Sequence, residues 1–181
     1  MYKTITDYFK KRPIYNEKFS DVCSEIKDKF NEGSKPVLRE SKTSTALFEK
    51  EFGYKLPDEI DEYINLFWHA YIYGYCLNAP ECIVLFSVLK KEGDSDNDIL
   101  FYSDGLITIS HEWEEIGDIQ KYIPIGWLGY SGAWVLYEVK SGKIFLEDVD
   151  SGIDGVIGEQ PIADSLCELI SKLEKHAQKL K

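Results

Sequence analysis

The chain has 181 residues, 44% of them hydrophobic, and carries 32 Asp/Glu against 21 Lys/Arg, a formal net charge of −11 at pH 7. This composition is typical of a globular protein, and its longest apolar stretches fall short of the roughly 18 residues that a membrane span needs. The acidic balance argues against nucleic-acid binding, because phosphate contacts require clustered Lys and Arg.

The charge is unevenly distributed. Residues 1–42 hold 10 Lys/Arg and 7 Asp/Glu, residues 43–118 hold 4 and 16, and residues 119–181 hold 7 and 9. A strongly acidic middle segment favours a cationic partner. We expect a single domain over residues 1–181, with an N-terminal helical segment over 1–42 and a core over 43–181.

The N-terminal half is predicted to be helical, because apolar residues recur there at spacings of three and four. In residues 1–42 they are Ile5, Tyr8, Phe9, Phe19, Val22, Cys23, Ile26 and Phe30. The beginning, "MYKTITDYFKKRPIYNEKF", lacks an apolar signal core and a small-residue cleavage site, which predicts a cytoplasmic protein. A second helix is expected to begin at Ser44 or Thr45 and to end at Gly53.

The stretch "LPDEIDEYINLFW" predicts a third helix. Pro57 suits the first helical turn, and Asp58 and Glu59 suit its positive end. The expected apolar stripe consists of Ile60, Ile64, Phe67 and Trp68.

From about Ala70 the pattern changes to that of strands. "AYIYGYC" (70–76) and "ECIVLFSVL" (81–89) are rich in β-branched and aromatic residues. "YIPIG", "AWVLYEV" and "KIFLEDV" predict three more strands, the last two joined by a hairpin in which Gly142 takes positive φ. The connection "GWLGYSG" (126–132) is expected to form turns. The four cysteines, Cys23, Cys76, Cys82 and Cys167, are predicted to be buried, reduced thiols.

Residues 99–120 fit two structures. "DILFYSDGLITIS" is either two strands joined by an Asp-Gly turn, or a helix entered through Ser95–Asp98 and interrupted at Gly105. We expect a strand over 106–110. A closing helix over 163–180 completes an α+β fold, in which a mostly antiparallel sheet packs against N-terminal helices and a C-terminal helix.

Metal and nucleophile motifs are incomplete. Ser131 in "GYSGA" is followed directly by Gly132 and a strand, whereas a nucleophile elbow needs Gly-x-Ser-x-Gly before a helix. "HEWEE" lacks the second histidine of a zinc site. In "DSDND" and "DVDSGIDGVIGE", Ile99 and Ile153 occupy the position where a calcium loop needs glycine. We predict no metal and no cofactor.

Glu112, Glu114 and Glu115 beside Trp113 keep one enzyme hypothesis open, a carboxylate-based hydrolase. It requires two carboxyl groups in one pocket, one of them desolvated enough to hold its proton. A solvated acidic surface accounts for the same residues, and the chain is predicted not to be an enzyme.

Two stretches resemble the SUKH superfamily. "FEKEFGYKLPDEIDEYINLFW" resembles its N-terminal signature of an aromatic residue, Leu-Pro and an acidic helix. "YIPIG", Gly132 before "AWVLYEV", and "SGKIFLEDVDSG" resemble its strand, turn and strand ending in acidic residues. The order of these motifs is most similar to the Syd-like branch, and the resemblance covers residues 43 to 173.

The resemblance implies a non-catalytic binding module with a cleft between helices and sheet. Bacterial members neutralise polymorphic toxins, many of which are basic nucleases. Syd-like members are thought to place an acidic surface against basic cytoplasmic loops of the SecY translocon, at the inner face of the cell membrane. We therefore expect an immunity protein that binds a basic toxin domain, with a Syd-like SecY regulator as the alternative, and a monomer or weak dimer.

We expect binding energy to centre on the acidic helix and an aromatic cluster. Desolvated aromatic anchors and the charges paired beside them typically cost ~2 kcal/mol or more when truncated, whereas rim charges mostly set the encounter rate. The candidate partner-binding residues are Asp58, Glu59, Asp61, Glu62, Phe67, Trp68, Trp127, Tyr130 and Trp134.

Overall fold

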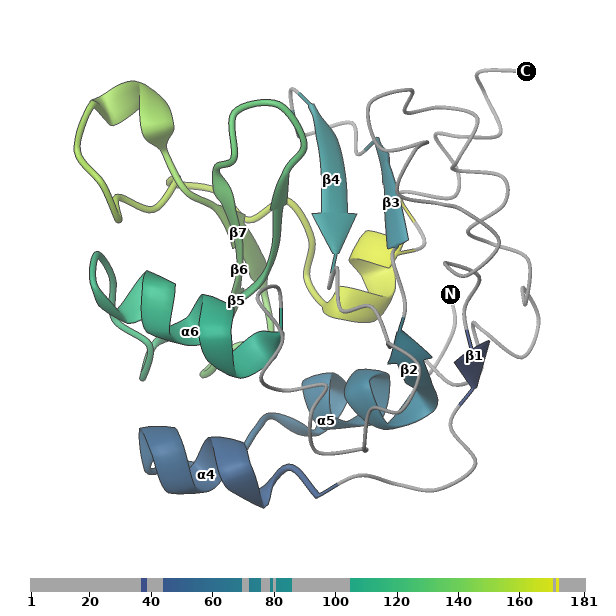
Figure 1. Ribbon diagram of the computed structural model, residues 1–181. Coiled ribbons are helices and arrows are strands. Elements are labelled where there is room, and N and C mark those ends of the chain that lie inside the picture. Colours follow the sequence, from purple (N-terminus) through teal and green to yellow (C-terminus); the bar gives the residue numbers. More distant parts are fainter. Residues whose placement is uncertain are drawn as a thin grey trace, which may run out of the picture.

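The computed structural model describes residues 37–38, 44–69, 72–75, 79, 81–85, 105–170 and 172 (Figure 1). In chain order its elements are β1 (Val37–Leu38), α4 (Ala46–Phe52), α5 (Asp58–Leu66), β2 (Phe67–His69), β3 (Ile72–Tyr75), β4 (Cys82–Leu85), α6 (Leu106–Glu114), β5 (Tyr122–Leu128), β6 (Trp134–Glu138), β7 (Ile144–Leu146) and the 3-10 helix η3 (Val149–Ser151). Residues 166–170 form a further short helix. The predicted α+β class is confirmed. The helical stripe predicted between Ile5 and Phe30 lies outside the described residues.

A five-stranded antiparallel sheet, in the order β3-β4-β5-β6-β7, forms the centre of the fold. The prediction that the connection begins at Gly126 was wrong, because β5 continues to Leu128 and pairs there with Ile83. Gly126 lies at a bulge so close to β4 that a Cβ would stand 2.0 Å from the carbonyl oxygen of Val84. Glycine is therefore needed here for a close backbone approach, not for a turn.

Helices α4 and α5 lie below the five-stranded sheet in Figure 1. As predicted, α4 ends at Gly53, which has a φ of 78° and donates its N–H to the Glu49 carbonyl. The carbonyl of Pro57 accepts the N–H groups of Ile60 and Asp61 at 3.0 Å each and so opens α5.

The predicted extension of the third helix through Phe67 and Trp68 was wrong. Helix α5 ends at Leu66, and β2 follows at once, antiparallel to β1. Phe67 is in register with Leu38, so tertiary strand pairing, together with the strand preference of consecutive aromatic residues, overrides the helical period.

Residues 106–110 form the start of α6, so the predicted strand there was wrong. Leu106, Ile109 and Trp113 are buried and recur at helical spacing. Thr and Ile residues favour strands locally. As a helix, however, the segment places its buried residues on one side, and this side packs against β5.

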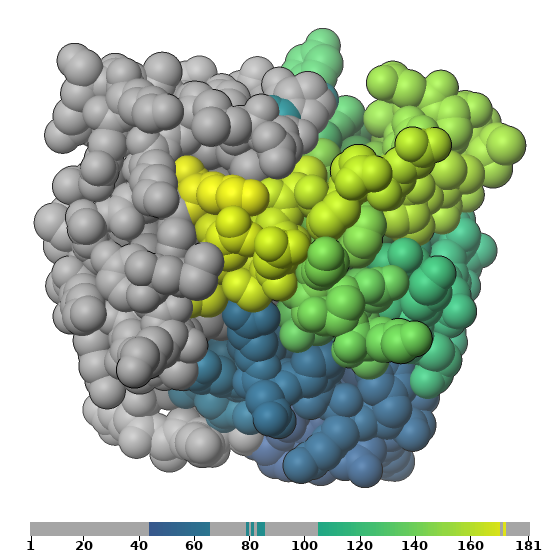
Figure 2. Space-filling model, turned by 180° about the vertical axis from the view of Figure 1, so that it is seen from behind, coloured from purple at the N-terminus to yellow at the C-terminus, as the bar shows by residue number. Residues whose placement is uncertain are grey.

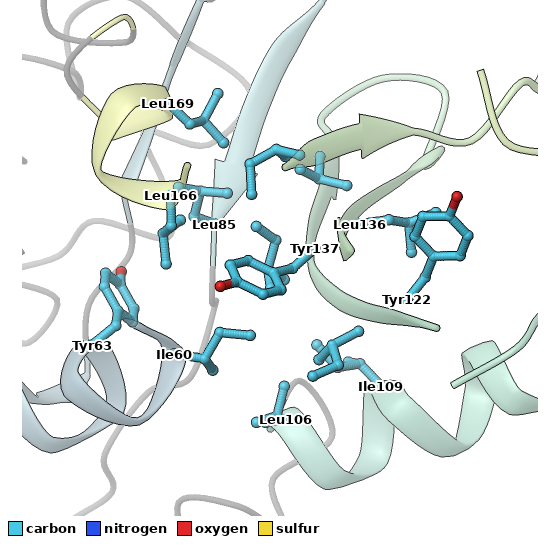
Figure 3. Packing of buried hydrophobic residues seen from close by; sticks show 14 of the residues in the cluster. Ile60, Tyr63, Leu85, Leu106, Ile109, Tyr122, Leu136, Tyr137, Leu166 and Leu169 are labelled. Carbon is cyan, nitrogen blue, oxygen red and sulfur yellow. The ribbon is translucent and has the colours of Figure 1, made fainter. Parts of the chain in front are cut away.

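The helices pack core residues against one face of the sheet, and Tyr122 and Leu136 are buried on the other side of β6 (Figure 3). Ile60, Leu106 and Leu166 come from α5, α6 and the 166–170 helix, and they converge near Tyr137 of β6 and Leu85 of β4. The hairpin between β6 and β7 is confirmed, with Gly142 at a φ of 74°. The part of the predicted closing helix beyond residue 172 lies outside the described residues.

Candidate functional site

The acidic helix α5 directs one of its carboxylates into the fold. Glu59 accepts the backbone N–H of Cys167 at 2.8 Å and that of Leu166 at 3.2 Å. These donors open the 166–170 helix, which lies directly against α5 in Figure 2, so Glu59 satisfies N–H groups that have no partner within that helix. Burial raises the pKa of Glu59, and the two N–H donors offset only part of this effect.

Asp61 also has internal partners. Its carboxylate accepts the Thr45 hydroxyl at 2.8 Å and the Asn65 amide at 3.2 Å, which ties the start of α4 to α5. Of the other two predicted acids on α5, Asp58 is exposed and Glu62 is partly buried. Two of the four predicted binding carboxylates thus have a structural role.

Two predicted aromatic anchors form a cross-strand pair. Trp127 on β5 and Trp134 on β6 are directly opposite in the register, so their side chains share one face of the sheet. Both are partly buried and pack against the core. Their exposed edges offer amphipathic indole surface, the type that is enriched at protein interfaces.

Two further aromatic residues of this face were not predicted from the sequence. Phe145 is in register with Leu136 and therefore lies on the same side as Trp134. Its ring meets that of Tyr122 edge to face at 5.9 Å. Alternation along "KIFLEDV" was the available signal. We call Tyr122, Trp127, Trp134 and Phe145 the aromatic face.

The turn that follows β5 presents the third predicted aromatic anchor. Tyr130 has a relative exposure of 84%, while its backbone N–H and that of Ser131 donate to Glu81 at 2.8 and 2.7 Å. One carboxylate oxygen therefore fixes the turn and leaves the tyrosine ring in solvent.

The predicted acidic and aromatic halves of the site lie on opposite faces of the sheet. Tyr137 points toward Ile60 of α5 (Figure 3), and burial, with smaller contributions from the charges of Glu59 and Asp58, raises the pKa of Tyr137 to about 12. Trp134 is three residues away on the same strand, and side chains alternate between faces. Within the described residues, α5 and the aromatic face therefore lie on opposite sides of the sheet.

Phe67 and Trp68, the remaining predicted anchors, belong to β2 and not to α5. The backbone of β2 pairs with β1 in a separate two-stranded sheet. They are therefore not part of the aromatic face.

A second inward-directed carboxylate was not predicted. Glu147 accepts the N–H of Trp134 at 3.2 Å through one oxygen and that of Gly155 at 3.0 Å through the other. It thereby connects the aromatic face to the loop that contains η3. No local sequence signal identifies this role, since the partners lie 13 and 8 residues away.

The geometry that the hydrolase hypothesis requires is not present around Trp113. Glu112, Glu114 and Glu115 are all exposed, whereas Trp113 is fully buried. His111 lies 3.1 Å from Glu51 and 3.4 Å from Glu114 on the surface. Within the described part of the chain, no group of three His, Cys, Asp or Glu side chains is arranged to hold a metal ion.

Among the described helices, none combines the length and the apolar character needed to cross a bilayer. No family model matches the chain, and neither a curated protein nor a solved structure matches it significantly.

Proposed function

We propose that this protein is a non-catalytic binding module that holds a basic protein partner against its aromatic face. The observation that carries the proposal is the in-register pair Trp127 and Trp134, partly exposed beside the fixed turn that presents Tyr130. Aromatic side chains of this kind supply large contact area for little loss of conformational entropy.

The charge of the surrounding surface supports a cationic partner. Residues 105–170 contain 12 Asp/Glu and 3 Lys/Arg. The exposed acids among them include Asp148, Asp150, Asp154 and Glu159 on the loop that follows β7. Such a surface accelerates association with a basic protein, and the acceleration falls as salt screens the charges.

The class of partner follows from the resemblance to the SUKH superfamily. It favours an immunity protein that masks a basic toxin domain, and a Syd-like protein that binds cytoplasmic loops of SecY is the alternative. The charge distribution supports both equally. We place the toxin first because a rigid aromatic face suits a folded domain better than flexible loops.

The test first identifies the genes beside this chain's gene, because an immunity gene lies beside its toxin gene, and the absence of a toxin gene there would contradict the immunity role. The two purified probes are then the toxin domain found in this way and peptides of the SecY cytoplasmic loops. We expect the toxin domain to bind the wild-type chain. Tyr130→Ala should weaken binding about tenfold or more without lowering the melting temperature, because the ring is exposed. Glu112→Gln, an exposed acid on α6, is the control.

Binding of the SecY peptides alone would support the alternative. Absence of binding to both probes at low salt would contradict the proposal as a whole. Retention of full affinity by both Tyr130→Ala and Trp127→Leu, with the fold intact, would remove the binding role of the aromatic face.

A further inference from the structure

The loop between β7 and the 166–170 helix projects from the body of the protein on the side where η3 lies (Figures 1 and 2). Its base is closed by two backbone hydrogen bonds. Asp148 donates to Val156 at 2.7 Å, and Gly158 donates to Leu146 at 2.9 Å. The residues between them form a distinct protrusion, and we call Val149–Asp154 the loop tip.

The loop tip has internal hydrogen bonds that fix its shape. The Ser151 hydroxyl donates to the Asp148 carbonyl at 2.7 Å and accepts the Ile153 N–H at 3.2 Å. Gly152, at a φ of 68°, ends η3 and donates to Val149. A segment with this geometry already fixed loses less entropy when a partner binds it.

A second set of contacts fixes the loop relative to the body. Glu147 accepts the Gly155 N–H and also contacts the backbone of Trp134 on the aromatic face. Gly155 lies against the Ile116 carbonyl so closely that a Cβ would stand 2.0 Å from the oxygen. The protrusion is therefore held beside the aromatic face and the end of α6.

Apolar side chains gather on this protrusion. The exposed large hydrophobic residues of the described chain are Ile116, Tyr130, Val149 and Ile153. Of these, Ile153 and Val149 lie in the loop tip with relative exposures of 67% and 48%, and the Ile116 backbone lies against the loop. Exposed apolar side chains that gather on one rigid element are typical of an interaction surface, whereas scattered ones are not.

The charges around these side chains identify the chemistry of the occupant. Residues 144–171 contain seven Asp/Glu and no Lys or Arg. Asp148, Asp150 and Asp154 flank Val149 and Ile153 and are exposed. The same loop of a second copy would bring like charges together, which disfavours self-docking through this loop. A partner with an apolar pocket surrounded by Lys and Arg would match both the exposed apolar side chains and the acidic residues of the loop tip.

We infer that the loop tip inserts Val149 and Ile153 into an apolar pocket, rimmed by Lys and Arg, on the protein partner. This inference rests on the proposed function and adds the element that selects among basic partners. The aromatic face supplies a broad contact area. The loop tip selects among partners, because it needs a pocket that fits Val149 and Ile153 and basic residues that pair with its aspartates.

The experiment measures binding of the same purified toxin domain to three variants. Val149→Ser/Ile153→Ser should lower affinity at least tenfold, mainly through faster dissociation, with an unchanged melting temperature. Asp150→Asn/Asp154→Asn should slow association several-fold at low salt and less at high salt. Tyr130→Ala reports on the aromatic face separately.

The outcomes separate the two proposals. If Tyr130→Ala weakens binding and Val149→Ser/Ile153→Ser does not, the inference is wrong and the proposed function stands. If the serine variant instead abolishes a concentration-dependent dimer and leaves toxin binding unchanged, the loop tip is a self-association surface and the inference is also overturned. If the wild-type chain fails to bind the domain at low salt, both are contradicted.

Discussion

Helix α5 and the loop after β7 are two acidic segments of the described chain, and they use their carboxylates in opposite ways. On α5, Glu59 and Asp61 accept hydrogen bonds from other elements. In the loop, Glu147 has such a role and Asp164 forms an ion pair with Lys143, while Asp150 and Asp154 remain exposed. The difference depends on whether hydrogen-bond donors from the rest of the fold lie within reach, and not on the number of acids.

The exposed acids of the loop make it a better candidate for partner binding than α5. Acidic residues at a helix start favour the helix dipole and are an ordinary structural feature. Exposed acids beside exposed Val149 and Ile153 have no such internal explanation. We therefore expect a partner to contact the loop, whereas the acidic residues predicted from the sequence to bind a partner lie on α5.

The largest expected effect concerns the anchoring of the loop. Gly155→Ala places a Cβ 2.0 Å from the Ile116 carbonyl oxygen at a φ of 76°, whereas Gly152→Ala, at a φ of 68°, meets no atom within 4 Å. We expect a loss of about 3 kcal/mol for Gly155→Ala, from the clash and the left-handed backbone together, and about 1 kcal/mol for Gly152→Ala from the backbone alone.

Urea unfolding of both variants measures these losses. The two glycines share the loop and the backbone region, so Gly152→Ala controls for everything except the contact with Ile116. Equal losses would show that the loop is not packed against that carbonyl, and the argument for a fixed protrusion would fail.

A smaller effect is expected from removing the carboxylate that joins α5 to the 166–170 helix. Glu59→Ala leaves the Leu166 and Cys167 N–H groups without this acceptor and should cost about 1 to 2 kcal/mol of unfolding free energy. Asp58→Ala, at the exposed neighbouring acid, should cost under about 1 kcal/mol.

The same variants separate structure from binding. If Glu59→Ala and Asp58→Ala leave toxin-domain affinity unchanged while the loop variants reduce it, the division between the acidic segments holds. A loss of affinity for Asp58→Ala without a loss of stability would return the binding role to α5.

Local patterns predicted the parts of the fold that local chemistry decides. Gly53 and Gly142 take the positive φ that their turns require, and Pro57 stands where α5 opens. These positions depend on a few neighbouring residues, so the sequence is sufficient to place them.

The wrong predictions concern segments that distant residues decide. Phe67 pairs with Leu38, and Gly126 lies against the backbone of β4, so neither position follows from its own neighbours. In α6, the β-branched residues locally favour a strand. The helix forms because its apolar side packs against β5, and the position of β5 cannot be predicted from these residues alone.

The candidate site has the same limits. Tyr130 and the pair Trp127 and Trp134 could be identified from residue type and strand alternation. The carboxylates that fix them could not, because Glu81 is 49 residues from Tyr130 and Glu147 is 13 residues from Trp134. Long-range pairing of this kind leaves no periodic signal.

The smallest expected effect is the pH dependence of Glu59. Burial is the main cause that raises its pKa above the usual value, and the charge of Glu62 adds to it. The folded chain therefore holds this proton to higher pH than the unfolded chain does. Between the usual pKa, about 4.3, and the raised one, the contribution of Glu59 to stability falls as pH rises, and it is constant above that window.

The measurement is the difference in unfolding free energy between the wild type and Glu59→Gln at several pH values, in which the other carboxylates largely cancel. The wild type should lose stability relative to the variant as pH rises through the window. Glu62→Gln should reduce that loss, because it removes a negative neighbour that raises the pKa of Glu59. A relative gain by the wild type would mean that the N–H donors of Leu166 and Cys167 outweigh burial, so that the folded chain would favour the charged form of Glu59.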